Sequence, residues 1–405
     1  MESSPALRVL LTFLLKTMIV ACMGIAQLHP TDLAALKELR SHLHDLPGSF
    51  FFATWDFQRE PCNDFMGVVC ESFLGDNRIS ILNLGIGYAG TPGLMGSLSP
   101  SVRNLTFLTQ LTLSPGKVTG EIPATLGELK LLNFIGISNN LLTGDIPASL
   151  GSLINLQVLD LSNNLLTGSI PQQVGRLPGL IAMTLSHNKL TGPIPNFTAG
   201  ILQHLDLGGN TLSGELPSIS NSLQYLSLDG NKLSGTLDRL ASLRNLTFVD
   251  LSFNYFTGNV PIDLLQLHMS ALFLQRNLLS GDAQPSRPVW IKTVDLSYNR
   301  LSGELSPFFA WAQNLYINNN NLSGMVPQKF LESLLEGSLQ MLYLQHNYFT
   351  GFQINPDEVL PPESSFCIQY NCMLPPVQST CPAKCGKIIS RPVQQCHDHI
   401  AGRIG

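Results

Sequence analysis

The sequence predicts an α/β solenoid of about 12 coils, with a parallel β-sheet along its concave side and a disulfide-stapled cap at each end. Two observations carry this prediction. A unit of 21 to 27 residues recurs along most of the chain, and segment 153–171, LINLQVLDLSNNLLTGSIP, shows it most plainly. An asparagine also returns at the same place in successive units. Self-similarity at such a period is typical of solenoids, because a single unit buries its apolar side chains only against its neighbours.

The first part of each unit predicts a short strand with one buried face. In the unit above, Leu159 and Leu161 alternate with Val158, Asp160 and Ser162. The side chains of a strand point alternately to its two faces, so the leucines face the interior and the residues between them face outward. Strands from successive coils then lie side by side in one parallel sheet.

The recurring asparagine follows each predicted strand, where the chain turns and leaves backbone donors and acceptors buried between coils. Its amide offers two donors and one acceptor on a short side chain, which can satisfy those groups. We expect this ladder to consist of Asn140, Asn164, Asn188, Asn210, Asn231, Asn254, Asn277, Asn299, Asn320 and Asn347.

The second part of each unit reads LTGxIP, as in 166–171, and resembles the plant-type leucine-rich repeat. The segment before the repeats carries Trp55, Cys62 and a Gly67-Val68-x-Cys70 ending. This combination resembles the N-terminal cap of plant leucine-rich repeat receptors and receptor-like proteins. Polygalacturonase-inhibiting proteins are similar too, but their caps carry a second cysteine pair that is missing here. The resemblance implies a right-handed superhelix and a Cys62–Cys70 disulfide.

The chain divides into four predicted segments: a secretory signal peptide at 1–26, an N-terminal cap at 27–78, the repeats at 79–354 and a cysteine-rich tail at 355–405. The first segment has positive charge at Arg8 and Lys16, an apolar run at 17–25 and a small-x-small ending. We find no other long apolar segment and no hydrophobic C-terminal tail, so we expect a secreted protein without a transmembrane segment.

Two segments depart from the strand-and-turn pattern and predict helices. The first, TDLAALKELRSHL, begins at Thr31, which we expect to be the N-cap. The second, QKFLESLLEGS, spans 328–338 and lengthens one repeat.

The tail contains five cysteines within thirty residues: Cys367, Cys372, Cys381, Cys385 and Cys396. In a secreted chain such cysteines are typical of disulfides that hold a small cap together. Five cysteines allow 15 arrangements of two bridges, with one cysteine left over, and the sequence does not choose among them. Their spacing and the neighbouring His397 and His399 also fit a zinc site, but an oxidising compartment favours disulfides, so we predict no metal.

Composition and motifs argue against several functions. Charged residues make up only 13% of the chain and the net charge is −5, so we expect no nucleic-acid partner. Phosphate-binding loops, kinase signatures and nucleophile elbows are missing from the sequence, and we predict no cofactor. A row formed by Asp160, Asp206, Asp250 and Asp295 contains paired carboxylates, as glycosidases do, but on an open sheet we expect a solvated face rather than catalytic residues. We therefore predict a protein that is not an enzyme.

The outward-facing positions of the C-terminal half favour partner binding. Aromatic side chains and an arginine gather there, and these residue types dominate protein interfaces. The alternative is that aromatic residues occur on strands for packing alone. The predicted concave partner-binding residues are Tyr225, Phe248, Phe253, Phe273, Arg276, Tyr298, Tyr316, Tyr343 and His346.

Four Asn-x-Ser/Thr sequences, at Asn104, Asn196, Asn245 and Asn321, predict glycosylation of a secreted protein. The resemblance implies a receptor-like recognition protein without its own kinase, binding a protein, peptide or glycan at the plant cell surface or wall. Such a protein would stay at the plasma membrane only through a partner such as a membrane receptor kinase. The alternatives are an inhibitor of a microbial wall-degrading glycosidase and a structural wall protein.

Overall fold

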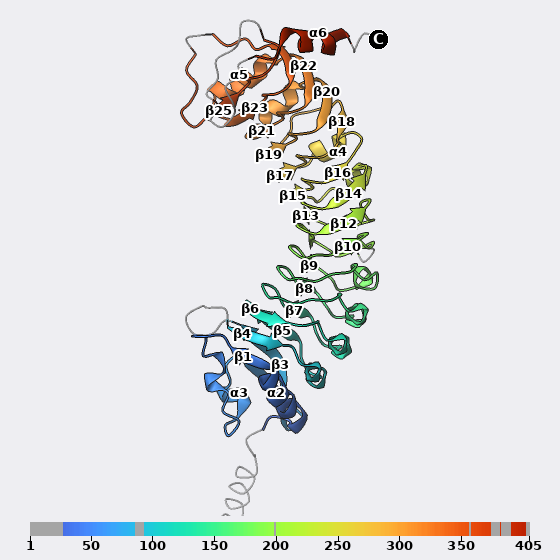
Figure 1. Ribbon diagram of the computed structural model, residues 1–405, viewed down its shortest axis with the longest axis vertical. Coiled ribbons are helices and arrows are strands. Elements are labelled where there is room, and N and C mark those ends of the chain that lie inside the picture. The colour runs from blue at the N-terminus through green and yellow to red at the C-terminus, as the bar shows by residue number, and fades with distance from the viewer. Residues whose placement is uncertain are drawn as a thin grey trace, which may run out of the picture.

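The computed structural model describes residues 27–85, 93–197, 200–355, 358–373, 381 and 390–401. The predicted signal segment and Cys385 lie outside these ranges. The coils stack into a curved solenoid, with the N-terminal cap at one end and the cysteine-rich segment at the other (Figure 1). The predicted solenoid fold is therefore confirmed.

One sheet of fourteen strands lines the concave side. Its first strand, β2, pairs antiparallel with β3, and every later neighbour pairs in parallel. In sheet order the strands are β2 (Val68–Phe73), β3 (Asp76–Gly85), β5 (Gln110–Ser114), β7 (Phe134–Gly136), β8 (Val158–Asp160), β9 (Ala182–Thr184), β11 (His204–Asp206), β13 (Tyr225–Ser227), β15 (Phe248–Asp250), β17 (Met269–Phe273), β19 (Ile291–Asp295), β21 (Asn314–Tyr316), β23 (Met341–Tyr343) and β25 (Ser365–Cys367). One more coil thus lies beyond 354, where the sequence pattern places the end of the repeats.

Smaller sheets run along one flank, where the LTG part of most units forms a second strand. They contain β1 (Leu43–Asp45), β4 (Leu94–Ser97), β6 (Gly116–Thr119), β10 (Thr191–Gly192), β12 (Thr211–Gly214), β14 (Lys232–Gly235), β16 (Tyr255–Phe256), β18 (Ser280–Gly281), β20 (Arg300–Glu304), β22 (Asn321–Met325) and β24 (Tyr348–Gly351).

Short helical turns precede many of the concave strands and close the coils. They are η3 (Pro100–Asn104), η4 (Ala124–Glu128), η5 (Ala148–Ser152), η6 (Val174–Arg176), η7 (Asp238–Ser242), α4 (Ile262–Leu265), η8 (Pro307–Trp311) and α5 (Gln328–Leu335). The last of these lies within the segment from which a helix was predicted. Consecutive turns contact one another from η3 to η6, between η7 and α4, and between η8 and α5, so the outer side is stacked in three groups.

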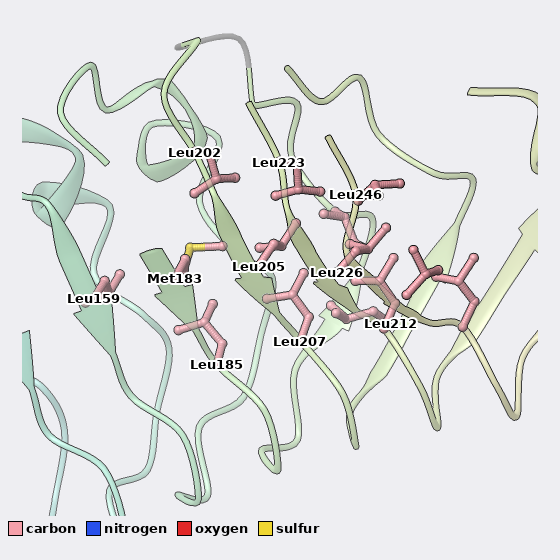
Figure 2. Packing of buried hydrophobic residues seen from close by; sticks show 14 of the residues in the cluster. Leu159, Met183, Leu185, Leu202, Leu205, Leu207, Leu212, Leu223, Leu226 and Leu246 are labelled. Atoms are coloured by element: carbon pink, nitrogen blue, oxygen red, sulfur yellow. The ribbon is translucent and has the colours of Figure 1, made fainter. Parts of the chain in front are cut away.

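The leucines of successive coils form one continuous core. Leu159, Met183, Leu205 and Leu226 are fully buried and follow one another in a row from coil to coil (Figure 2). Since each coil covers the leucines of the next, the stacking supplies the apolar burial that no single unit achieves.

The asparagine ladder hydrogen-bonds consecutive coils through buried amides. The Asn254 Nδ2 group donates to the main-chain oxygens of Leu228 (2.8 Å), in the preceding coil, and Ser252 (3.1 Å). Its Oδ1 atom accepts from the Leu233 N–H at 2.9 Å. All ten predicted asparagines make the two equivalent bonds to the preceding coil, one donated by Nδ2 and one accepted by Oδ1. Asn371 adds an eleventh, in the coil of β25.

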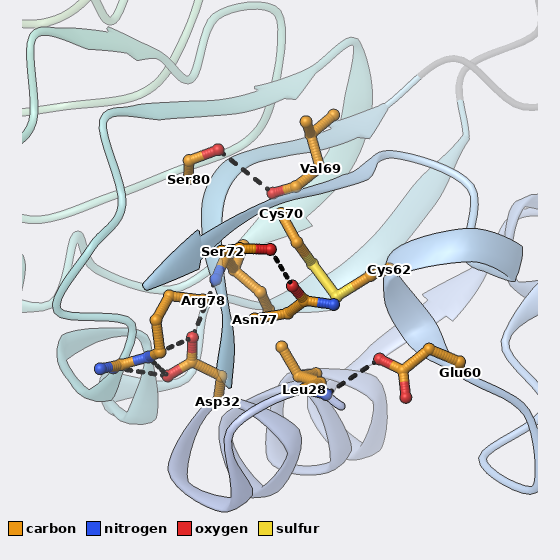
Figure 3. Close-up of a disulfide and its surroundings, with 11 residues drawn as sticks. Leu28, Asp32, Glu60, Cys62, Val69, Cys70, Ser72, Asn77, Arg78 and Ser80 are labelled. Atoms are coloured by element: carbon orange, nitrogen blue, oxygen red, sulfur yellow. Dashed lines mark hydrogen bonds and ion pairs between the residues drawn. A yellow bond between two sulfur atoms is a disulfide. The ribbon is translucent and has the colours of Figure 1, made fainter. Parts of the chain in front are cut away.

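Helix α2 (Pro30–His42) closes the N-terminal end, but its N-cap is His29 rather than the expected Thr31. The physical reason is Pro30, because proline is favoured at the first helical position, where its missing N–H costs nothing. Behind the helix, the Cys62–Cys70 disulfide ties the short helix α3 (Pro61–Asp64) to β2 (Figure 3).

Two disulfides fasten the other end. Cys367, at the end of β25, is joined to Cys381, and Cys372 is joined to Cys396 in helix α6 (Val393–Ala401). Within the described ranges, the structure contains no helix long and apolar enough to span a bilayer.

Candidate functional site

The candidate residues lie in three rows across the concave sheet. The strand-end row takes the last residue of each strand, and its C-terminal part is Asp206, Ser227, Asp250, Phe273, Asp295, Tyr316 and Tyr343. The strand-start row contains His204, Tyr225 and Phe248. The bend row follows the strands, one position before each ladder asparagine, and contains Phe253, Arg276, Tyr298 and His346.

The strand-start row forms a continuous stack of rings. The centroids of His204 and Tyr225 are 4.2 Å apart with an interplanar angle of 12°, and those of Tyr225 and Phe248 are 4.6 Å apart at 4°. Phe248 then meets Phe273 of the strand-end row edge to face at 6.0 Å. Burial lowers the pKa of His204, so its imidazole is neutral at pH 7. The stack is thus an uncharged aromatic ridge whose ring faces cover one another.

Tyr316 and Tyr343 form a second aromatic pair further along the strand-end row. Their centroids are 5.1 Å apart at an angle of 80°, and both rings are half-buried. Burial is the main cause that raises the pKa of Tyr316, so this hydroxyl is protonated at neutral pH and can donate a hydrogen bond.

Two carboxylates of the strand-end row lie among these rings. Burial raises the pKa of Asp250 and of Asp295, and the Ser252 and Ser297 groups that donate to them oppose the shift. The Ser252 N–H donates to Asp250 Oδ1 at 2.9 Å, and the Ser297 hydroxyl donates to Asp295 Oδ1 at 2.6 Å. In the described ranges no group of three or more acidic, histidine or cysteine side chains is placed to hold a metal ion.

These carboxylates give a prediction about stability and pH. An aspartate has a pKa of about 3.9 in an unfolded chain. Since folding raises the pKa of Asp250 and Asp295, ionisation opposes folding above the folded-state pKa, and this cost is absent at low pH. We expect the double variant Asp250→Asn/Asp295→Asn to have a higher free energy of unfolding than wild type at pH 7. Asparagine keeps one acceptor oxygen at each position. The advantage should fall to zero near pH 3, and denaturant titrations across this range measure it.

The matched control for that titration is Asp160→Asn. Asp160 accepts the same local hydrogen bonds from Ser162, but its sheet neighbours are Gly136 and Thr184 rather than aromatic residues. A double variant that is less stable than wild type at pH 7, or that gains no more than Asp160→Asn, would contradict the assignment.

The bend row is unusual in its backbone. Phe253, Arg276 and Tyr298 have φ values of 54°, 56° and 54°, in the left-handed region that disfavours side chains of this size. Several other coils hold residues at the equivalent position that tolerate this conformation, such as Gly230 (φ 61°) and Asn319 (φ 56°), although Tyr370 (φ 56°) in the last coil does not. Large side chains at these positions therefore are not explained by the needs of the coil.

These three side chains make a sandwich. The Arg276 guanidinium lies 4.3 Å from the Tyr298 ring centroid and 5.2 Å from that of Phe253. Phe253 is 53% exposed and Tyr298 is 43% exposed, so a large part of each side chain stays open to solvent. His346 lies apart from this group and packs instead on Tyr370, at 4.8 Å.

The strain in the bend row gives a second prediction. We expect Phe253→Asn to leave the free energy of unfolding unchanged or to raise it by up to about 1 kcal/mol, because a left-handed phenylalanine is replaced by a residue that tolerates the conformation. Tyr255→Asn is the control, since Tyr255 is equally exposed but lies in the flank strand β16, outside the left-handed region. Chemical denaturation measures both. A loss of more than about 1 kcal/mol in Phe253→Asn would show that the ring stabilises the coil.

The candidate residues thus form three groups. These are Tyr225, Phe248 and Phe273 of the aromatic ridge, Arg276 with Phe253 and Tyr298, and the pair of Tyr316 and Tyr343. Tyr370, which is absent from the predicted residues, continues the bend row after His346. Its signal was Asn371, which stands 24 residues after Asn347 and marks one more unit.

The four predicted glycosylation sites lie away from the concave strands. Asn104 ends η3, Asn321 begins the flank strand β22, and Asn245 donates to the main-chain oxygen of Asn221 from an exposed position between η7 and β15. Asn196 accepts from the N–H of Ser218 and is also exposed. Glycans at these positions would leave the three rows free.

The chain is similar to known leucine-rich repeat proteins. Residues 29–71 match the leucine rich repeat N-terminal domain, and residues 130–190, 154–212, 222–243, 245–267 and 290–311 match leucine rich repeat models. From Arabidopsis thaliana, DNA damage-repair/toleration protein DRT100 is 33% identical over 111 residues, and Receptor-like protein 18 is 35% identical over 101 residues. The matches cover 25% and 24% of this chain but only 28% and 12% of those proteins.

A solved structure agrees with this family. The plant peptide hormone receptor RGFR1, in complex with RGF2, superposes with a TM-score of 0.63 and 30% identity. The superposition covers 72% of this chain and 48% of the receptor chain.

Proposed function

Because the chain is a leucine-rich repeat protein similar to plant receptor-like proteins, we propose that it binds an extended peptide or protein segment along the C-terminal half of its concave face. The single observation that carries the proposal is the alignment of aromatic side chains and an arginine on successive coils from β11 to β23. The corresponding strand-end positions of the N-terminal half hold Thr112, Gly136, Asp160 and Thr184. Such an open row suits an extended partner that meets one coil after another.

The ring geometry favours a peptide over a glycan. Sugars pack against the open faces of aromatic rings, whereas the faces of the His204–Tyr225–Phe248 stack cover one another. What the ridge presents outward is ring edges, which suit the aromatic and aliphatic side chains of a peptide. The bound peptide hormone of the similar receptor structure supports the same class of partner.

In this proposal the protein is not an enzyme and acts outside the cell. The predicted signal peptide, the disulfides at both ends and the glycosylation sites on other faces fit an oxidising, extracellular setting. Recognition would be transmitted through a partner such as a membrane receptor kinase, at the plant cell surface or wall.

The test is a crosslinked pull-down from plant cell-surface and wall fractions, with the secreted protein as bait. The wild type is compared with Phe273→Ala/Tyr298→Ala/Tyr316→Ala and with a control, Thr112→Ala/Thr184→Ala, in the N-terminal half of the sheet. Recovery of a peptide or receptor ectodomain by wild type and control, but not by the triple variant, is the expected result. Recovery of a wall-degrading glycosidase would support an inhibitor instead, and recovery of wall polymer alone would support a structural protein.

A further inference from the structure

Trp290 differs from the other two tryptophans of the chain. Trp55 is buried in the N-terminal cap, where its ring stacks on Phe65 at 5.1 Å. Trp311 is half-buried and packs against Phe308 at 6.1 Å. Trp290 is 54% exposed, and within the described ranges no other ring and no cation packs on it. A large part of this aromatic side chain is therefore open to solvent, which is unusual for tryptophan.

Trp290 belongs to a row of outward side chains on the side of the solenoid where the concave strands begin. This row, the edge row, lies three positions before the strand-start row, and three successive coils contribute Asn245, His268 and Trp290 to it. All three are exposed, and the residue that follows each of them is buried. Since neighbouring residues of an extended chain point to opposite sides, the three side chains project from the same side of the coils.

Main-chain pairing holds the edge row in register. The Ser270 N–H donates to the main-chain oxygen of Thr247 at 2.8 Å, and Met269 pairs with Ile291 in the next step. Neighbouring strands of a sheet are about 4.8 Å apart, so the first and third members of the edge row are about 10 Å apart along the backbone. Two linked sugar rings span a comparable length.

The first member of the edge row is a predicted glycosylation site, Asn245-Leu246-Thr247. The Asn245 Nδ2 group donates to the main-chain oxygen of Asn221, in the preceding coil, at 2.7 Å. An amide nitrogen carries two hydrogens, and N-glycosylation replaces one of them. The remaining hydrogen can keep the bond to Asn221, and the sugar then leaves Nδ2 on the side away from the preceding coil.

Polar side chains border the edge row. Thr247, Ser270 and Lys292 lie two positions after its three members and are exposed. Within the described residues Lys292 forms no ion pair, so its ammonium is available to donate. A sugar packs its apolar C–H face against an aromatic ring and turns its hydroxyl and acetamide groups to polar neighbours. The edge row offers both kinds of contact.

We propose that the first two N-acetylglucosamine units of a glycan on Asn245 lie along the edge row, the first over His268 and the second against Trp290. The inference rests on the predicted glycosylation of Asn245 and goes beyond the proposed function, because it assigns a binding site for the protein's own glycan. The docked glycan covers Trp290 and stays beside the concave sheet rather than across it.

The test follows cleavage of the Asn245 glycan by endoglycosidase H in the native secreted protein, produced in cells that add high-mannose glycans. This enzyme cuts between the first two N-acetylglucosamine units, so packing of the second unit on Trp290 shields the bond. Mass spectrometry of the glycopeptides gives the rate for wild type, Trp290→Ala and Trp290→Tyr.

The matched control is a second glycan in the same row, introduced by Gln157→Thr, which makes Asn155 a glycosylation site. Asn155 is exposed and donates to the Lys130 main-chain oxygen at 2.8 Å, as Asn245 does to Asn221. The next two coils place Gly179 and Ile201 in the row, so no aromatic ring lies beside this glycan.

We expect the Asn245 glycan to be cleaved about 2- to 10-fold more slowly in wild type than in Trp290→Ala, as for one aromatic contact. Trp290→Tyr should keep part of the protection, because a ring remains. The Asn155 glycan should be cleaved at one rate with or without Trp290. This control also detects general loosening of the fold, which would expose both glycans.

Three outcomes overturn the inference. The Asn245 glycan could be cleaved equally fast in wild type and Trp290→Ala, or the Asn155 glycan could be protected to the same extent, and either result would show that Trp290 holds no sugar. A secreted protein without a glycan on Asn245 would remove the premise. All three leave the concave site untouched, since its test uses Phe273, Tyr298 and Tyr316.

Discussion

Replacing Asn254 with alanine is expected to lower the free energy of unfolding by about 3–5 kcal/mol. Asn254 is 5% exposed, and its amide donates to the main-chain oxygens of Leu228, Leu251 and Ser252 and accepts from the Leu233 N–H. Alanine removes all four bonds and leaves buried backbone groups without partners, which is the costly outcome for a polar group. Denaturant-induced unfolding followed by circular dichroism measures the loss.

The control is Asn155→Ala, since Asn155 is exposed and donates one hydrogen bond, to the Lys130 main-chain oxygen at 2.8 Å. We expect it to cost no more than about 1 kcal/mol. The ladder would not be the element that holds the coils together if Asn254→Ala were as stable as this control.

Removing the buried carboxylate of the N-terminal cap should have a similar effect, also about 3–5 kcal/mol. Asp32, in helix α2, is fully buried and accepts from Arg78 Nη2 at 2.9 Å and from the Ile79 N–H at 2.9 Å (Figure 3). Asp32→Ala would leave the largely buried guanidinium of Arg78 without its counter-charge and would detach the helix from β3. Thermal and denaturant unfolding test this.

Two further variants test whether burial of the ion pair causes the loss of stability expected for Asp32→Ala. Asp32→Asn keeps an acceptor for the Ile79 N–H and should lose less stability than Asp32→Ala. Glu128→Ala breaks an exposed pair with Arg103, at 3.9 Å, and should cost well under about 1 kcal/mol. Equal losses in Asp32→Ala and Glu128→Ala would refute the role given to the buried pair.

The repeated parts of the fold could be predicted from the sequence because the same physical problem recurs in every coil. Leu159 and Leu161 show the strand face, and Asn164 marks the turn that follows. The last coil was missed because Phe366 and Ile368 replace leucines among cysteines and prolines, although both are buried and Asn371 follows in register. The unusual composition of this last unit hid it, although the spacing from Asn347 to Asn371 matches that of the other units.

Other features depend on contacts between coils, which spacing does not specify. The sequence placed Phe253, Arg276 and Tyr298 in one row, but the guanidinium sandwich follows from their left-handed backbone and side-chain orientation. The tail bridges Cys367–Cys381 and Cys372–Cys396 depend on how the last coil meets helix α6, so the sequence left 15 arrangements open.

The central claim is that the C-terminal half of the concave face binds the partner, and a binding curve tests it most directly. The affinity of the recovered partner is measured for wild type, Phe273→Ala/Tyr316→Ala and Thr112→Ala/Thr184→Ala. We predict a loss of about 100-fold or more for the aromatic double variant, as expected for two interface anchors, and no change for the threonine variant. Equal affinities for wild type and the aromatic variant, or a loss confined to the threonine variant, would contradict the account.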